Sequence, residues 1–217
     1  MIKNFLILGD SYSTYEGFIP EGYKFYYSIQ GRPNVDVTRM SVDQTWWKRF
    51  MDKTGANLVL NNSWSGSTVC HTSRDGNDCS KTNSFIFRFR QLRDNGFFKT
   101  NEIDTIIVFG GTNDSWGNCP LGELKFSDFT EKDLFSFKPA ISYLAGLIKE
   151  TLPKVNLILI INTDLKEEIG DTIKKVAEHY NAHALFLKDI EKDSRHPTPI
   201  GMESICNQLI EFIKNNL

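Results

Sequence analysis

The sequence lacks long hydrophobic runs, and no apolar stretch approaches the roughly 18 residues that a helix needs to span a bilayer. Its formal net charge is only −2, so neither nucleic acid nor an anionic membrane is favoured as a partner. Internal repeats and low-complexity tracts are also missing. From these absences we do not expect a membrane-spanning protein, a repeat array or a nucleic-acid binder.

No secretory leader is visible in the sequence as written. The apolar stretch from Phe5 to Leu8 is too short for the hydrophobic region of a signal peptide, and no small-residue cleavage site follows it. The sequence as written therefore predicts a cytoplasmic protein, or a periplasmic or secreted one if a leader was removed before Met1.

Cysteine is scarce, and the four cysteines, including Cys206, have no tight CxxC spacing. Three arrangements are open. The thiols are free, or Cys70 and Cys79 form a loop disulfide, or these two join Cys119 and His71 around a metal. Free thiols are favoured because disulfides are uncommon in the cytoplasm. We expect neither a metal nor a cofactor.

Short apolar runs without alternation are present, as is typical of parallel strands covered on both faces. They are Ile2–Leu8, Leu58–Leu60, Thr105–Phe109, Leu157–Ile161 and, more weakly, Ala184–Leu187. Helical patterns lie between them. The first is capped by Asp43 or Thr45 and ends at Gly55, and the others are Ser84–Asp94, Ser136–Thr151, Leu165–Tyr180 and Gly201–Leu217.

This alternation predicts one α/β domain over residues 1–217. We expect a three-layer αβα sandwich around a five-stranded parallel sheet of flavodoxin-like order, with the functional site at the carboxyl ends of the strands. Two segments, about 14–42 and 118–135, fit no regular element. Loops of this length are often binding loops or lids, so both are expected to be substrate loops, with surface decoration as the alternative.

A serine follows the first predicted strand directly, in Gly9-Asp10-Ser11. A serine hydroxyl becomes a useful nucleophile only when a base removes its proton, and that base is usually oriented by a carboxylate. Of the four histidines, His196 is the best candidate, because it lies in an irregular loop with Asp193 three residues before it. His71, in a polar loop, stays a minor alternative base.

Acyl transfer also requires hydrogen-bond donors for the oxyanion. The Ser11 N–H is one candidate, and the turn after the second strand offers the N–H of Gly66. The turn after the third strand offers the side-chain amide of Asn113. Each motif is common by itself, but their joint occurrence in this order is far more specific.

In these blocks the chain resembles the SGNH hydrolases, a branch of the GDSL esterase and lipase group. The matching residues are Gly9-Asp10-Ser11, Gly66, Gly111-x-Asn113-Asp114 and Asp193-x-x-His196. The resemblance implies that Ser11 is the nucleophile, His196 the general base and then acid, and Asp193 its orienting residue. It also implies an oxyanion hole of Ser11, Gly66 and Asn113, and it agrees with the predicted sandwich.

Aromatic side chains near the proposed site suit sugar faces, because they combine flat apolar area with polar tips. Tyr12, Tyr15, Trp64 and Trp116 are the candidates for substrate binding. We therefore expect a serine esterase that removes a small acyl group, such as acetyl, from a carbohydrate or similar polar substrate. The alternatives are a lipase or thioesterase for longer acyl chains, and a non-catalytic carbohydrate-binding protein on the same fold.

Overall fold

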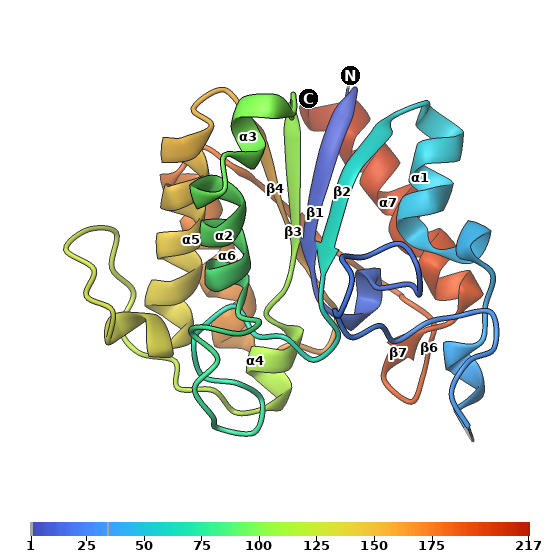
Figure 1. The fold of residues 1–217 in the computed structure, drawn as a ribbon, viewed down its shortest axis with the longest axis horizontal. Helices are drawn as coiled ribbons and strands as arrows, with labels where there is room; N and C mark the ends of the chain where they lie inside the picture. The colour runs from blue at the N-terminus through green and yellow to red at the C-terminus, as the bar shows by residue number, and fades with distance from the viewer. Residues whose placement is uncertain (1, 34) are drawn as a thin grey trace.

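A computed structural model describes residues 2–33 and 35–217, so Met1 and Asn34 lie outside the described residues. A parallel sheet forms the central layer, and its strand order is β2-β1-β3-β4-β5 (Figure 1). The strands are β1 (Asn4–Gly9), β2 (Asn57–Ser63), β3 (Thr105–Phe109), β4 (Asn156–Ile161) and β5 (His183–Phe186). The predicted sandwich and its flavodoxin-like order are therefore confirmed.

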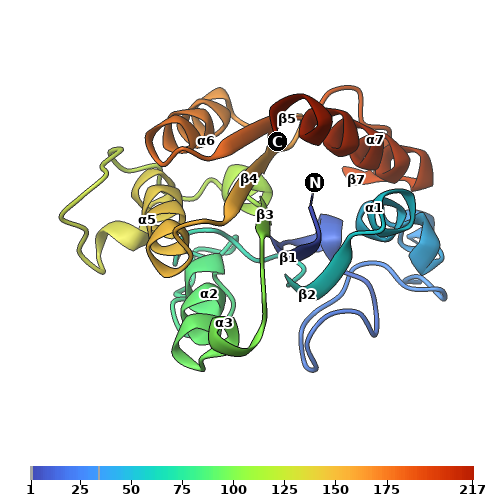
Figure 2. The ribbon, with the colours of Figure 1, turned by 90° about the horizontal axis from the view of Figure 1, so that it is seen from above.

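Helices cover both faces of the sheet (Figure 2). One face carries α2 (Phe85–Asp94), α3 (Phe97–Thr100), α5 (Phe137–Thr151) and α6 (Glu167–His179), and the other carries α1 (Trp46–Thr54) and α7 (Pro199–Asn216). Successive strand residues alternate between two hydrophobic cores. Leu6 and Leu8 of β1 join the core under α5, whereas Phe5 and Ile7 join the core under α1 and α7. Burial on both faces explains why the strand sequences show no alternation.

The long helices agree with the sequence patterns, and the side chain of Thr45 caps α1 by accepting a hydrogen bond from the Lys48 N–H. The helix predicted for Ser84–Asp94 is present as α2, with Ser84 as its cap. No helix in the described part of the chain is long and apolar enough to cross a membrane.

Several short elements have no counterpart in the sequence analysis. They are the 3₁₀ helices η1 (Ser11–Ser13), η2 (Asp36–Thr38), η3 (Val42–Gln44) and η4 (Asp133–Phe135), the helices α3 and α4 (Thr112–Trp116), and the hairpin β6 (Lys192–Asp193) with β7 (His196–Pro197). η1, α4 and the hairpin lie at the carboxyl edge of the sheet (Figure 1). This is the edge at which parallel sheets form their sites.

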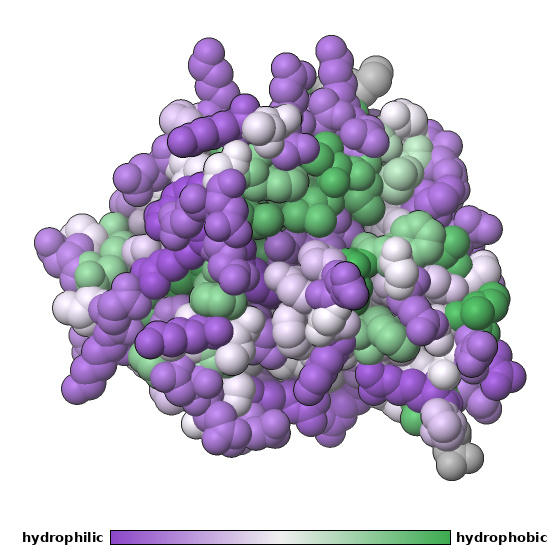
Figure 3. Space-filling model, viewed as in Figure 1, coloured by the Kyte–Doolittle hydropathy of each residue, from purple (hydrophilic) through white to green (hydrophobic). Residues whose placement is uncertain are grey.

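The sheet ends at the edge strand β2, and apolar surface gathers over this strand in Figure 3. Its residues Leu58, Val59 and Leu60 are half-buried. Much of the surrounding surface in that view is hydrophilic.

A buried arginine ties three segments together at the carboxyl edge. Arg88 on α2 is fully buried, and its guanidinium donates to the Gly9 carbonyl at 3.1 Å, to Asn62 Oδ1 at 3.0 Å and to Ser67 Oγ at 3.1 Å. It also donates to the Asn62 and Asn83 carbonyls. Burial lowers the pKa of Arg88 to about 10, so the group stays charged at neutral pH. These oxygens replace the water that the charge loses.

We predict that Arg88→Met lowers the free energy of unfolding by about 3 kcal/mol or more, because each buried carbonyl left without a donor costs about 1–3 kcal/mol. Urea unfolding measures the loss. The matched control is Arg93→Met on the same helix, where the lost partner is the neighbouring surface residue Asp94, and there we expect a change within about 0.5 kcal/mol. A loss below about 1 kcal/mol for Arg88→Met would contradict the assigned role.

Candidate active site

Strand β1 delivers Ser11 to the carboxyl edge. Gly9 ends the strand where an added Cβ would lie 2.6 Å from Ser63 Oγ and 2.8 Å from Ser13 Oγ, so no larger residue fits. Asp10 then caps η1 by accepting a hydrogen bond from the Tyr12 N–H at 3.1 Å. Ser11 is the first residue of η1, and its N–H donates to no other described residue.

Ser11 and His196 meet across the site. Ser11 Oγ lies 3.0 Å from His196 Nε2, although 184 residues separate them in the chain. The strand end and the C-terminal hairpin therefore bring together the two side chains that the sequence analysis proposes as nucleophile and base.

The hairpin that carries His196 turns through two residues with left-handed backbone. Ser194 has φ 49° and Arg195 has φ 70°, values that a two-residue type I′ turn requires but that these residue types seldom adopt. Both carbonyls of the turn are held in place. The Tyr12 hydroxyl donates to the Arg195 carbonyl, and His196 Nδ1 lies 3.3 Å from the Ser194 carbonyl. The site's own side chains thus stabilise a strained turn.

Asp193 pairs with His196 in the hairpin register, but its carboxylate does not hydrogen-bond to the imidazole. The side chain is exposed and accepts a hydrogen bond from Ser194 Oγ at 3.0 Å. The Ser194 carbonyl is the acceptor that Nδ1 faces. The predicted orienting carboxylate is thus beside the histidine, but a backbone oxygen holds the position expected for it.

Burial dominates the electrostatics of His196. It lowers the pKa of the imidazole to about 4, with smaller contributions in the same direction from Arg32, Arg74 and Lys192. The hydrogen bond with the Ser194 carbonyl opposes this shift. At neutral pH the imidazole is therefore uncharged and able to accept a proton.

The second candidate donor lies in a turn after β2. The Ser67 N–H donates to the Trp64 carbonyl at 3.1 Å, which places Gly66 at the third position of the turn with φ 84°. A type II turn requires glycine or asparagine there. Open space surrounds the position of an added Cβ, and the Gly66 N–H has no acceptor in the described part of the chain.

The third donor comes from α4. The amide of Asn113 is buried and donates one N–H to the Ser67 carbonyl at 3.0 Å. A side-chain amide has two N–H groups, so the second stays available for a substrate oxygen. Its neighbour Asp114 accepts the N–H groups of Val69 and Cys70 at 2.9 and 3.2 Å. Together the two α4 residues fix the loop that carries Gly66.

Two buried carboxyl groups support these loops. Burial raises the pKa of Asp10 to about 7 and that of Asp114 to about 6. Asp114 uses both oxygens as acceptors, whereas Asp10 Oδ2 has no partner among the described residues.

The predicted substrate aromatics are placed unequally. Trp116 is half-buried and contacts His196 with ring centroids 5.7 Å apart. Trp64 packs on Tyr23 at 4.4 Å. Tyr12 and Tyr15 are buried, with 0% and 6% of their surfaces exposed, so neither presents an open ring face to a ligand in this structure.

Sequence reasoning missed Tyr26, whose ring stacks on the His196 imidazole with centroids 3.7 Å apart and planes at 11°. Its position in an irregular, aromatic-rich insertion gave no signal that singled it out. The 14–42 segment therefore contacts the site. The 118–135 segment packs elsewhere: Phe126 stacks on His179 of α6, and Phe129 contacts Tyr143 of α5.

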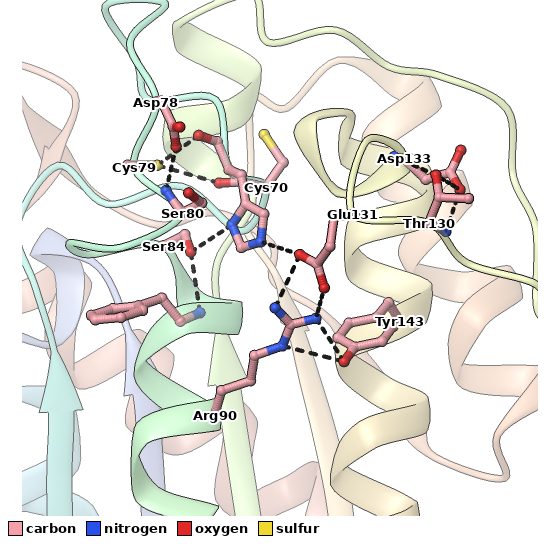
Figure 4. Close-up of polar contacts among 12 residues, drawn as sticks. Cys70, Asp78, Cys79, Ser80, Ser84, Arg90, Thr130, Glu131, Asp133 and Tyr143 are labelled. Atoms are coloured by element: carbon pink, nitrogen blue, oxygen red, sulfur yellow. Dashed lines mark hydrogen bonds and ion pairs between the residues drawn. The ribbon is translucent and has the colours of Figure 1, made fainter. Parts of the chain in front are cut away.

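The alternative base His71 lies in a separate buried cluster. Its Nδ1 is 2.9 Å from Ser84 Oγ, and its Nε2 is 3.9 Å from a Glu131 oxygen. Figure 4 shows Glu131 reaching toward this cluster and paired with Arg90. Because Ser84 is fully buried and caps α2 through the Phe87 N–H, this serine has a structural role.

All four cysteines are buried free thiols in the structure. The Cys70 and Cys119 thiols and a carboxylate oxygen of Asp114 lie within 4.8 Å of one another. Both thiols donate to the Thr72 carbonyl at 3.4 Å, and Asp114 is occupied by backbone N–H groups. His71 faces Ser84, so it does not complete a ligand set with these groups. We assign no metal to this cluster.

Comparison with known proteins identifies the family of this chain. A family model described as GDSL-like Lipase/Acylhydrolase matches residues 3–213. A GDSL-like lipase from Bacteroides ovatus is 38% identical, with 100% of each chain covered and a TM-score of 0.90. One from Bacteroides uniformis is 39% identical, with 99% of this chain and 96% of that chain covered and a TM-score of 0.89.

A more distant likeness concerns the fold alone. An acetyl xylan esterase from the rumen bacterium Butyrivibrio proteoclasticus is 17% identical over 98% of this chain and 64% of that chain, with a TM-score of 0.64. The search of curated proteins gave no match. Because the family model spans nearly the whole chain and both Bacteroides structures exceed 30% identity across it, this chain belongs to the GDSL-like lipase/acylhydrolase family.

Proposed function

We propose that the protein is a serine esterase in which Ser11 attacks the ester carbonyl and His196 transfers the proton. The observation that carries the proposal is the 3.0 Å contact between Ser11 Oγ and His196 Nε2 at the carboxyl edge of the sheet. Membership of an acylhydrolase family supports the reaction class.

The reaction proceeds in two steps, acylation of Ser11 and hydrolysis of the acyl-serine. Ser11 Oγ forms a bond to the acyl carbon while His196 takes the hydroxyl proton. The bond to the alcohol oxygen then breaks, and that oxygen leaves with the proton. Water next attacks the acyl-serine, His196 takes a proton from the water, and Ser11 leaves with that proton. One ester and one water thus become one acid and one alcohol.

The developing oxyanion is assigned to the N–H groups of Ser11 and Gly66 and to the free N–H of Asn113. All three donors lie on segments that converge at the carboxyl edge, and two of them lack another acceptor among the described residues. Donors fixed before the reaction stabilise developing charge without reorganisation.

Asp193 is proposed to complete the triad, although it does so without a direct hydrogen bond in this structure. The Ser194 carbonyl orients the imidazole, at 3.3 Å from Nδ1. The Asp193 carboxylate, held by Ser194 Oγ in the same turn, stabilises the imidazolium through its charge.

A small acyl group on a polar alcohol fits the surroundings best. The cavity beside Gly66, of about 240 Å³, is lined by Lys24, Ser65, Gly66, Ser73, Arg74, Asp75 and Asn83. A second one, of about 380 Å³, is lined by Trp116, Asp164, Lys192 and Arg195. The apolar groove between α1 and α7 includes Ile2, which precedes β1 and so lies at the other end of the strand from Ser11. A long acyl chain would find little apolar surface in the two cavities near the site.

We predict that Ser11→Ala removes nearly all hydrolysis of p-nitrophenyl acetate, while circular dichroism shows an unchanged fold. Wild-type kcat/KM should fall from acetate to longer acyl esters. Retention of more than about a tenth of the wild-type rate would rule out Ser11 as nucleophile. A preference for long chains would instead favour the lipase or thioesterase alternative, and inactivity on every ester would favour a binding protein.

The Asp193→Asn variant tests the indirect role of the carboxylate. Because the Ser194 carbonyl still orients Nδ1, we expect kcat/KM to fall by about tenfold, far less than the roughly 10⁴-fold loss seen where a carboxylate holds the imidazole directly. Ser194→Ala, which removes the hydroxyl that holds Asp193 but keeps the carbonyl, should show a loss no larger than that of Asp193→Asn. A loss near 10⁴-fold for Asp193→Asn would show that the carboxylate takes over Nδ1 during the reaction.

The acid limb of the pH profile reports the protonation of His196. Imidazole is neutral above its pKa, so a pKa lowered to about 4 keeps the base form present in weak acid. We expect kcat/KM for p-nitrophenyl acetate to stay level down to about pH 5 and to fall below it as one proton binds. Far-UV circular dichroism at each pH is the control for unfolding. An acid limb centred near the ordinary value of about 6.5 would contradict the prediction.

A further inference from the structure

His196 is enclosed by three aromatic rings, and a cationic side chain packs over each of these rings. The ring of Tyr26 stacks on the imidazole, and those of Tyr12 and Trp116 approach it with centroids at 5.4 and 5.7 Å. The cations over them are Arg32 on Tyr26 at 4.8 Å, Lys192 on Tyr12 at 5.8 Å and Arg195 on Trp116 at 5.6 Å. Three positive charges therefore lie around the proposed base, each separated from the imidazole by one aromatic ring.

Carboxylates neutralise this cluster incompletely. Asp164 pairs with Lys192 at 3.0 Å, and Asp193 is exposed in the same hairpin. Arg32 and Arg195 are exposed, and neither forms an ion pair within the described part of the chain. Arg32 donates instead to the Phe25 carbonyl at 2.7 Å. Two guanidinium groups thus face solvent next to the site without an anionic partner.

The proposed reaction determines which part of the substrate lies next to these cations. His196 gives its proton to the departing alcohol oxygen, so the alcohol lies over His196, while the acyl oxygen points to Gly66 and Asn113. The 380 Å³ cavity on the Trp116 and Arg195 side is large enough for a group of sugar size. Its lining includes Arg195, and also Lys192 paired with the carboxylate of Asp164, so Arg195 is the cation there that has no ion-pair partner among the described residues.

Resting on the proposed esterase function, we propose that the alcohol part of the substrate is anionic and that Arg195 binds its charged group. A carboxylate, as in a hydroxy acid or an acidic sugar, is the assigned chemistry, because the planar guanidinium matches it with two parallel hydrogen bonds. Arg32 strengthens the attraction from the Tyr26 side of the imidazole. Trp116 offers its ring to the apolar face of the same alcohol.

The test compares mono-O-acetylated glucuronate with mono-O-acetylated glucose, which differs in lacking the charge, and with mono-O-acetylated glucose 6-phosphate. Wild-type kcat/KM is expected to be at least about tenfold higher for the glucuronate ester than for the glucose ester. Raising the salt concentration should reduce this preference, because it screens exposed charges.

Arg195→Asn removes the guanidinium while asparagine still accepts the left-handed backbone of the turn. It should reduce the charged-to-neutral ratio of kcat/KM about tenfold, mainly through KM. Arg32→Gln should reduce the ratio by a smaller factor. Arg93→Asn, near the end of α2 and away from the carboxyl edge, is the matched control and should leave the ratio unchanged.

Calorimetric binding of glucuronate and glucose to the Ser11→Ala variant separates this inference from the esterase proposal. Hydrolysis that depends on Ser11 but shows no preference for the charged ester overturns the anion subsite alone. Preferential binding of glucuronate without hydrolysis that depends on Ser11 overturns the esterase proposal and supports the subsite. A preference for the phosphate ester over the glucuronate ester overturns the assignment to a carboxylate.

Discussion

The buried guanidinium of Arg88 sets the spacing between the two strand ends that carry the proposed nucleophile and the Gly66 turn. A charge held away from water is costly unless oxygen acceptors replace the solvent, and here carbonyl and side-chain oxygens from β1, β2 and the following turn do so. Because the guanidinium is a rigid planar fork, it fixes these acceptors relative to one another. The positions of Ser11 and Gly66 follow from that arrangement.

The C-terminal hairpin supplies the other half of the site, and it depends on contacts rather than on local preference. Ser194 and Arg195 occupy left-handed backbone that usually belongs to glycine or asparagine, at a cost of order 1–3 kcal/mol each. Hydrogen bonds to both turn carbonyls, from the Tyr12 hydroxyl and the His196 ring, offset that strain. The position of His196 is therefore coupled to η1, the element that carries Ser11.

The regular part of this architecture could be predicted from the sequence because its signals are local. Unalternated apolar runs marked the strands, and a strand followed directly by Gly9-Asp10-Ser11 marked the carboxyl edge. The burial of Arg88 could also have been predicted, because Arg88 stands three residues after Phe85 and so lies on the same, buried face of the helix. No sequence pattern indicates the positions of Tyr26 and of the Ser194 carbonyl. Their positions depend on how an irregular insertion and a strained turn fold against distant residues, which no periodicity encodes.

The positive charge around His196 affects both the protonation of the free enzyme and the binding of the proposed anionic substrate. Positive groups favour the neutral imidazole, which the first proton transfer requires, but they disfavour the imidazolium that this transfer creates. In this structure the nearby carboxylate of Asp193 does not touch the ring to relieve that cost. An anionic alcohol bound over Trp116 and Arg195 would bring a negative charge to the histidine at the step in which it becomes cationic. On this view the substrate's charge contributes to catalysis as well as to binding, because it counters the positive field that adds to the effect of burial on the imidazole.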